Sequence, residues 1–161
     1  MTLFEINEND KSIVLVFGRL CSGKGTFCQP YKEQGFNHVT TSDIVKRVSG
    51  KSTRSELTKT GDLDKAIAEE MIKEIEQSQP IIVDGIRQKS IVERVLQHFG
   101  EENVEMIWLE VPADIRRDRF TNRAATKDDQ SFDDAEQSDS KLGIDDLEKS
   151  MKGRTKIVNF H

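Results

Sequence analysis

The segment from Val16 to Thr26 contains the most specific chemistry in this chain of 161 residues. Its residues follow the order Gly18-x-x-x-x-Gly23-Lys24. Glycine lets the backbone turn so that successive N–H groups point into one concavity, and a following helix adds the positive end of its dipole. Lysine supplies a point charge to the outer phosphates. The spacing therefore predicts a phosphate-binding loop, and a tight turn that caps a helix is the alternative.

The flanking residues support this prediction, because a phosphate loop must join a buried strand to a helix. Residues 12–17 form a continuous β-branched and apolar run, which is typical of a strand buried on both faces. A helix is expected from the loop to about Gln34, and Gly35 ends it.

Strand and helix signals alternate along the rest of the chain, which indicates an α/β domain with a parallel sheet. Further strands are expected at residues 37–40, 81–84, 104–111 and 156–160. Further helices are expected at residues 63–76, 90–99, 114–123 and 143–152, the second of them opened by a capping box at Ser90 and Glu93. No long linker divides the chain, so residues 1–161 are expected to form one domain.

Composition excludes several classes of protein. The longest apolar run, Ile13–Phe17, is far too short for a transmembrane helix, which needs about 20 residues. Residues 1–11 are acidic and polar, unlike a signal peptide. Cys21 and Cys28 have no histidine at ligand spacing, so reduced thiols are expected rather than a disulfide or a zinc centre. We therefore expect a cytoplasmic protein with no membrane partner.

Residues 128–148 form the most acidic part of the chain, with nine carboxylates and one lysine. This composition predicts a solvated loop and helix face, and a mobile flap over a site is the alternative. The formal net charge of −5 is therefore unevenly distributed, since many of the cations lie near the predicted phosphate loop and around residues 116–123.

The end of the phosphate loop departs from the strict pattern, because Gly25 replaces the usual Ser or Thr and the hydroxyl follows at Thr26. This Gly-Lys-Gly-Thr ending resembles the adenylate kinase-like group of nucleoside monophosphate kinases, including the dephospho-coenzyme A kinase relatives. The resemblance covers residues 13–160. It implies a single three-layer P-loop kinase domain with a central parallel five-stranded sheet and a short lid. Relatives continue beyond the fifth strand, so a chain that stops at His161 is either minimal or incomplete.

The resemblance implies that ATP is the phosphoryl donor and that Mg²⁺ is the cofactor. The ATP-binding residues that it implies are Gly18, Ser22, Gly23, Lys24, Gly25 and Thr26. In this group magnesium is held mainly through water and phosphate oxygens. Thr26 and Asp84 are the residues expected near the metal, since Asp84 ends a predicted strand at the ligand crevice.

An acceptor-binding region is expected at about residues 41–78, where Thr41–Arg47 resembles the segment after the second strand of these kinases. Lys46 takes the place of the family's arginine, and Arg47 is adjacent. The run Asp84-Gly-x-Arg87 resembles the family's Asp-Gly-x-Arg, with a plain Asp–Gly turn as the alternative. The acceptor-binding residues implied by the resemblance are Arg47, Arg54 and Arg87.

A lid is expected at about residues 116–135, where the arginine-rich helix of the family is matched. Arg119 and Arg123 are four residues apart and share one helix face, and Arg116 lies one turn earlier. Phosphoryl transfer needs cations on its developing charge, whereas a solvated basic face is the alternative. Lys127-Asp128-Asp129 resembles the family's Arg-Asp-Asp after the lid.

The catalytic residues expected from the resemblance are Lys24, Asp43, Arg119 and Arg123, with a nucleotide-type acceptor. Asp43 is either a general base for a hydroxyl acceptor or the N-cap of a helix. Three alternative functions remain open. They are a dephospho-coenzyme A kinase-like enzyme, a viral kinase of the host cytoplasm that acts on hydroxymethyluracil in DNA, and a non-catalytic nucleotide-binding regulatory module. The negative net charge argues against DNA as a partner.

Overall fold

A five-stranded parallel sheet forms the centre of the molecule, in a computed structural model that describes residues 11–49, 63–124 and 131–160. The strands are β1 (Ile13–Gly18), β2 (Asn37–Thr40), β3 (Ile81–Asp84), β4 (Val104–Glu110) and β5 (Lys156–Asn159). They lie in the order β2-β3-β1-β4-β5. The predicted α/β fold with a parallel five-stranded sheet is confirmed.

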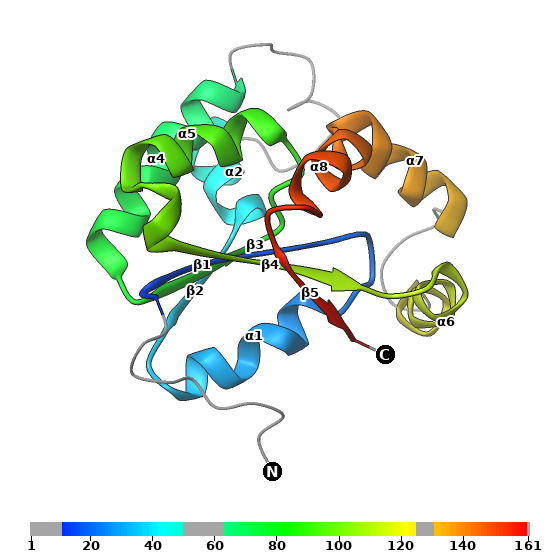
Figure 1. Cartoon of the computed structure of the whole chain (residues 1–161). Helices are drawn as coiled ribbons and strands as arrows, with labels where there is room; N and C mark the ends of the chain where they lie inside the picture. The colour runs from blue at the N-terminus through cyan, green and yellow to red at the C-terminus, as the bar shows by residue number, and fades with distance from the viewer. Residues whose placement is uncertain (1–10, 50–62, 125–130, 161) are drawn as a thin grey trace.

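Helices cover both faces of this sheet (Figure 1). The described helices are α1 (Lys24–Glu33), α2 (Thr41–Ser49), α4 (Leu63–Ser78), α5 (Lys89–Phe99), α6 (Ala113–Ala124), α7 (Phe132–Leu142) and α8 (Ile144–Met151), with a short 3-10 turn at Glu101–Asn103. Helix α1 lies on one face, and α2, α4, α5 and α8 lie on the other (Figure 1). The result is three layers, with α6 directly beyond the carboxyl end of β4.

The core explains why β1 is apolar at every position. Its side chains alternate between the two faces of the sheet, as they must in a strand. Leu15 and Phe17 pack in the larger cluster with α2, α4, α5 and α8, whereas Val14 and Val16 pack against α1. The edge strand β5 is less covered, and its Ile157 is 48% exposed.

Helix α7 is not among the helices expected from the sequence, which predicted a solvated loop and helix face for the acidic segment as a whole. The Ser131 hydroxyl accepts a hydrogen bond from the backbone N–H of Asp134 at 3.1 Å, which caps the helix. Phe132 is buried and packs edge-to-face on Phe120 of α6, with ring centroids 5.7 Å apart, an arrangement that aromatic pairs favour. The buried Phe132 ring and the Ser131 cap therefore stabilise a helix that the acidic composition of this segment did not predict.

The predicted capping box at Ser90 is also wrong. Helix α5 begins at Lys89 after Gln88, and no side-chain cap is formed there. The Ser90 hydroxyl instead donates to Asp64 Oδ2 on α4 at 3.2 Å. A tertiary contact between two helices has replaced the local one.

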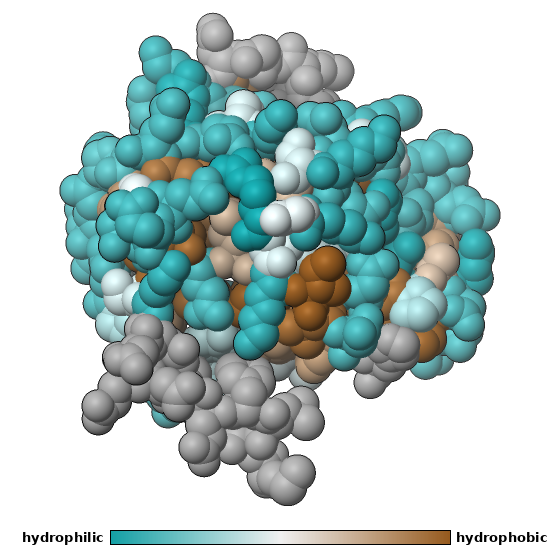
Figure 2. All heavy atoms as spheres, in the orientation of Figure 1, coloured by the Kyte–Doolittle hydropathy of each residue, from teal (hydrophilic) through white to brown (hydrophobic). Residues whose placement is uncertain are grey.

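The surface agrees with the high content of charged residues, 33% of the chain. The face shown in Figure 2 is mostly hydrophilic, with only separate apolar areas. Within the described ranges, no helix combines the length and the apolar character needed to cross a membrane.

Candidate active site

The loop between β1 and α1 has the backbone that its glycines predict. Gly23 adopts φ 88 and ψ 26 in degrees, a left-handed conformation that favours glycine. A Cβ at Gly23 would also lie 2.9 Å from a ring carbon of Phe160. At Gly18 a Cβ would lie 2.3 Å from Ser22 Oγ, so both glycines are required by close packing. The predicted order of buried strand, tight loop and helix is confirmed.

A cavity of about 590 Å³ opens over this loop. Its lining from the loop and α1 comprises Leu20, Cys21, Ser22, Gly23, Lys24, Gly25 and Thr26. Asp84 and Arg87 enter from the end of β3, and Arg119 and Arg123 enter from α6. The cavity thus lies at the carboxyl ends of the central strands, where open α/β sheets bind ligands. Among the described residues, its lining contains four cationic side chains and one carboxylate, which favours an anionic ligand.

Lys24 is held across its own loop. Its Nζ donates to the carbonyl oxygens of Gly18 at 3.1 Å and Arg19 at 3.3 Å. Burial, and after it the positive charge of Arg87, lowers the pKa of Lys24 to about 8, because both disfavour the ammonium form. A phosphate group would supply the opposite charge that this buried ammonium needs.

The two predicted lid arginines both line the cavity. Arg119 donates from Nη1 to Cys21 O and from Nη2 to Phe160 O, each at 3.1 Å, and so joins α6 to the loop and to the end of β5. The guanidinium of Arg123 lies 5.7 Å from the ring centroid of Phe120, within cation–π range. A guanidinium has five N–H donors, so Arg119 keeps donors for a ligand beyond these two bonds.

Arg87 is fixed by a carboxylate that sequence reasoning missed. Its Nε donates to Asp139 Oδ1 at 2.6 Å, and its Nη1 donates to Gly85 O at 2.9 Å. Asp139 lies on α7 and is only 1% exposed. A buried carboxylate in an acidic segment has no local sequence signal, because its partner is far away in the chain.

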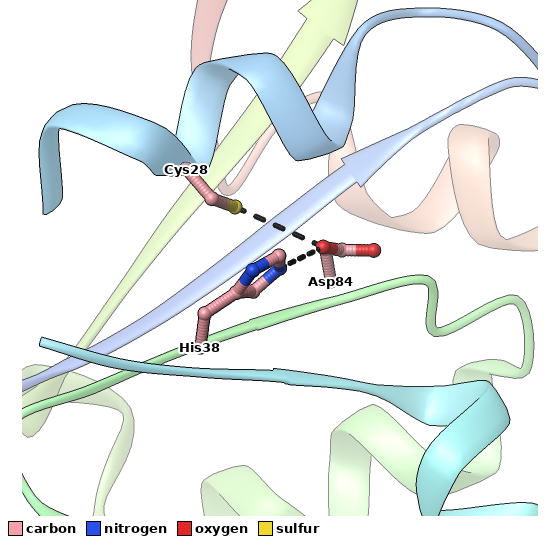
Figure 3. Close-up of side chains that lie close together, drawn as sticks. All are labelled: Cys28, His38 and Asp84. Atoms are coloured by element: carbon pink, nitrogen blue, oxygen red, sulfur yellow. Dashed lines mark hydrogen bonds and ion pairs between the residues drawn. The ribbon is translucent and has the colours of Figure 1, made fainter. Parts of the chain in front are cut away.

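Asp84, the last residue of β3, lines the cavity and is contacted by polar side chains from two other elements. It is 7% exposed, and its Oδ2 is hydrogen-bonded to His38 Nε2 and accepts from Cys28 Sγ at 3.8 Å. Figure 3 shows these three side chains converging from β3, β2 and α1. Burial, and after it the charge of Asp84, raises the pKa of the Cys28 thiol well above its ordinary value. Their sequence spacing did not reveal this proximity, because it arises from strand order.

Other predicted site residues are not brought to this cavity. Asp43 is exposed in the first turn of α2 and is not among the described residues that line the cavity. Its backbone N–H donates to Thr40 Oγ1 at 3.2 Å, so Thr40, rather than Asp43, caps this turn. Arg47 is 46% exposed at its side chain and pairs with Glu74 at 3.0 Å.

Two further predictions have different outcomes. Arg116, one turn before Arg119 in the predicted lid helix, is 6% exposed and donates to the carbonyl oxygens of Val111 and Leu20 and to Glu136. It holds α6 against the loop and α7 and is not among the described residues that line the cavity. Arg54, the middle of the predicted lid (residues 125–130) and the Lys127-Asp128-Asp129 segment lie outside the described residues.

The sequence is similar to proteins of several descriptions. A family model described as AAA domain matches residues 14–141. A UPF0200 protein of Thermococcus kodakarensis is 27% identical over 80% of this chain and 77% of its own length. An adenylate kinase of Bacteroides thetaiotaomicron is 29% identical over 78% of this chain and 73% of its own length.

Solved structures of low sequence identity share the fold. A gluconokinase from Sinorhizobium meliloti has a TM-score of 0.61 at 14% identity, covering 92% of this chain and 82% of that chain. A shikimate kinase from Bacteroides thetaiotaomicron has a TM-score of 0.61 at 12% identity, covering 91% of this chain and 85% of that chain. The family match and the relatives support P-loop kinase-like phosphotransfer. The chain therefore belongs to the AAA domain family, and its fold is that of the P-loop kinases.

Proposed function

We propose that this protein transfers the γ-phosphoryl group of ATP, bound with Mg²⁺, to a nucleotide-type acceptor that carries a phosphate. The observation that carries this proposal is the lining of the cavity, where Lys24, Arg119 and Arg123 surround a glycine-rich loop at the start of a helix. Phosphoryl transfer depends on positioning and on neutralising charge, and these are the groups that provide both. The similarity to adenylate kinases supports a nucleotide acceptor.

Each residue has a defined role in this proposal. Lys24 and the loop N–H groups hold the β- and γ-phosphates, and Thr26 lies near the α-phosphate. Asp84 orders the water shell of Mg²⁺, which it suits as a carboxylate lining the cavity. Arg119 and Arg123 neutralise the charge that develops as the bond between the γ-phosphorus and the bridging oxygen breaks and an acceptor oxygen attacks. Magnesium, when bound, adds further neutralisation of the phosphate oxygens.

Arg87 is the residue proposed to bind the acceptor phosphate. Arg87 lines the cavity together with Asp84, and its Nε donates to Asp139. Pairing through Nε leaves other N–H groups of the same guanidinium for a phosphate oxygen. An arginine fixed in this way selects an anionic acceptor through charge and geometry together.

A hydroxyl acceptor is the second candidate. It would need a general base in the cavity, which a phosphate acceptor does not need. A hydroxyl must lose its proton, so a carboxylate has to lie within hydrogen-bond reach. The expected base, Asp43, is absent from the cavity lining in the described part of the chain, where Asp84 is the carboxylate present. Because the proposal assigns Asp84 to Mg²⁺, no second carboxylate of the described lining remains to act as a general base, and this supports a phosphate acceptor, which needs none. Dephospho-coenzyme A and hydroxymethyluracil in DNA are therefore the alternatives to be tested.

The experiment is a transfer assay with γ-labelled ATP and Mg²⁺. The acceptors are the nucleoside and deoxynucleoside monophosphates, dephospho-coenzyme A, and DNA that contains hydroxymethyluracil. Label is expected in one or more nucleoside diphosphates. Label only in coenzyme A or in DNA would replace the proposal with the hydroxyl-acceptor function, and ATP binding without transfer to any acceptor would favour a regulatory module.

A further inference from the structure

Three side chains from three elements converge beside the phosphate cavity (Figure 3). Cys28 comes from α1, His38 from β2 and Asp84 from the end of β3. Their donor atoms, one sulfur, one imidazole nitrogen and one carboxylate oxygen, all lie within 4.8 Å of one another. The chain has two cysteines and three histidines, so the meeting of one of each at a buried carboxylate calls for a physical reason.

This set of donors matches the chemistry of one class of ion. Thiolate, imidazole and carboxylate are the ligands of Zn²⁺ and similar divalent transition metals, whereas Mg²⁺ prefers oxygen. Bonds of ~2.0–2.3 Å around a tetrahedral ion place ligand atoms roughly 3.3–3.8 Å apart. Cys28 Sγ and Asp84 Oδ2 are already separated by 3.8 Å. The hydrogen bond between His38 and Asp84 would have to open so that the ion could enter between their donor atoms.

We propose that Cys28, His38 and Asp84 form a binding site for a zinc-like divalent cation. The three ligands close the site from the sheet and from α1. The fourth ligand comes from the cavity that Asp84 also lines, as a water molecule or a phosphate oxygen. Three protein ligands with one open position constitute the arrangement of a zinc site that remains accessible to small molecules.

The protons and charges of this step balance. The Cys28 thiol loses its proton to solvent as the sulfur–metal bond forms. The Nε2 proton of His38, which is shared with Asp84 before the ion binds, moves by way of solvent to Nδ1, so the neutral imidazole binds the ion through Nε2. Asp84 binds as the carboxylate. One thiolate, one carboxylate and one divalent cation sum to zero charge, which suits a site where Cys28 is fully buried and the other two ligands are mostly buried.

Occupancy has a consequence for the proposed kinase activity. In Figure 3 the second oxygen of Asp84 lies on the side away from Cys28 and His38. A divalent cation on Oδ2 would neutralise the charge of the carboxylate. Asp84 would then order the water shell of Mg²⁺ less effectively. Zinc is therefore expected to inhibit phosphoryl transfer. This inhibition rests on the proposed function, whereas cation binding itself does not.

Titration of the full-length protein with Co²⁺, a spectroscopic substitute for Zn²⁺, tests the site without any activity assay. A thiolate-to-cobalt charge-transfer band in the near ultraviolet, bleached by added Zn²⁺, is the expected result. Cys28→Ser should abolish the band, and His38→Gln should weaken cobalt affinity at least as much as the ~10–100-fold that changes in outer-shell partners cost. Circular dichroism on each variant shows that the fold is retained.

Matched variants serve as controls. Cys21→Ser removes the other thiol, and His98→Gln removes an exposed histidine that pairs with Glu76 at 2.7 Å. Both should leave the cobalt band unchanged. A band that persists in Cys28→Ser, or one that is lost in Cys21→Ser, would overturn the assignment. So would the absence of a band in the wild-type protein, because the triad would then be only a hydrogen-bonded network. Zinc that binds without inhibiting transfer would contradict the role of Asp84 and leave the metal site standing.

Discussion

The buried ion pair between Arg87 and Asp139 leads to a stability prediction for Asp139→Ala. Removing one partner of a buried pair costs ~3–5 kcal/mol, because the other charge stays buried without compensation. Here Asp139 is almost completely buried, and the distance between Arg87 Nε and Asp139 Oδ1 is 2.6 Å. Arg87 also lines the cavity and keeps its bond to Gly85 O. We therefore expect a loss at the lower end of that range, about 3 kcal/mol.

Urea unfolding followed by tryptophan fluorescence measures this loss. Trp108 is the single tryptophan of the chain and is buried in β4, so its emission reports on the core. With an m-value of ~1–3 kcal/mol/M, a loss of about 3 kcal/mol lowers the midpoint by roughly 1–3 M. Asp133→Ala is the matched control on the same helix, since Asp133 is an exposed carboxylate that pairs with Arg117 at 3.1 Å. Surface pairs of this kind contribute ~0–1 kcal/mol.

The reasoning is refuted if the midpoint of Asp139→Ala shifts no further than that of Asp133→Ala. A double variant, Arg87→Met with Asp139→Leu, tests the cause of the effect. It leaves no buried charge, so it should be more stable than Asp139→Ala alone. Equal or greater loss in the double variant would mean that an uncompensated charge is not the reason.

Three further predictions concern the phosphate loop. Lys24→Ala should abolish phosphoryl transfer while circular dichroism stays native, and transfer at the wild-type rate would contradict the site assignment. Because the pKa of Lys24 is lowered to about 8, the side chain is cationic below that pH and loses its charge above it. ATP affinity measured by calorimetry should therefore fall as the pH rises past the pKa of Lys24, and Lys24→Arg should flatten this dependence, since arginine stays charged. Gly23→Ala should lower stability by ~1–2 kcal/mol or more because of its left-handed backbone, and the close Phe160 ring adds to the loss. Gly25→Ala, where a Cβ meets nothing within 4 Å, should be nearly neutral. Urea unfolding of both variants measures the difference.

The sequence by itself predicted the sheet and the phosphate loop because their signals are contiguous. The unbroken apolar run Ile13–Phe17 favours a strand buried on both faces. All six residues of β1 are indeed buried. The glycines at 18 and 23 mark positions where local backbone geometry and close packing admit no side chain. The phosphate-loop spacing identified Lys24, and the resemblance to the lid helix of P-loop kinases identified Arg119 and Arg123; each is carried to the cavity by the element in which it lies.

Only the tertiary structure decided which distant residues complete the site. Asp139 and Arg87 are 52 positions apart in the chain and pair through the packing of α7. His38 and Asp84 are 46 positions apart and meet because β2 and β3 are neighbours in the sheet, although a long segment separates them in the chain. Arg116 turned out to be a packing residue because its partners lie on the loop and on α7. Local preferences act through adjacent residues, whereas ion pairs and hydrogen bonds of this kind depend on strand order and helix packing. That is why the cations of the site were predictable, while the carboxylate that holds Arg87 and the imidazole that meets Asp84 were not.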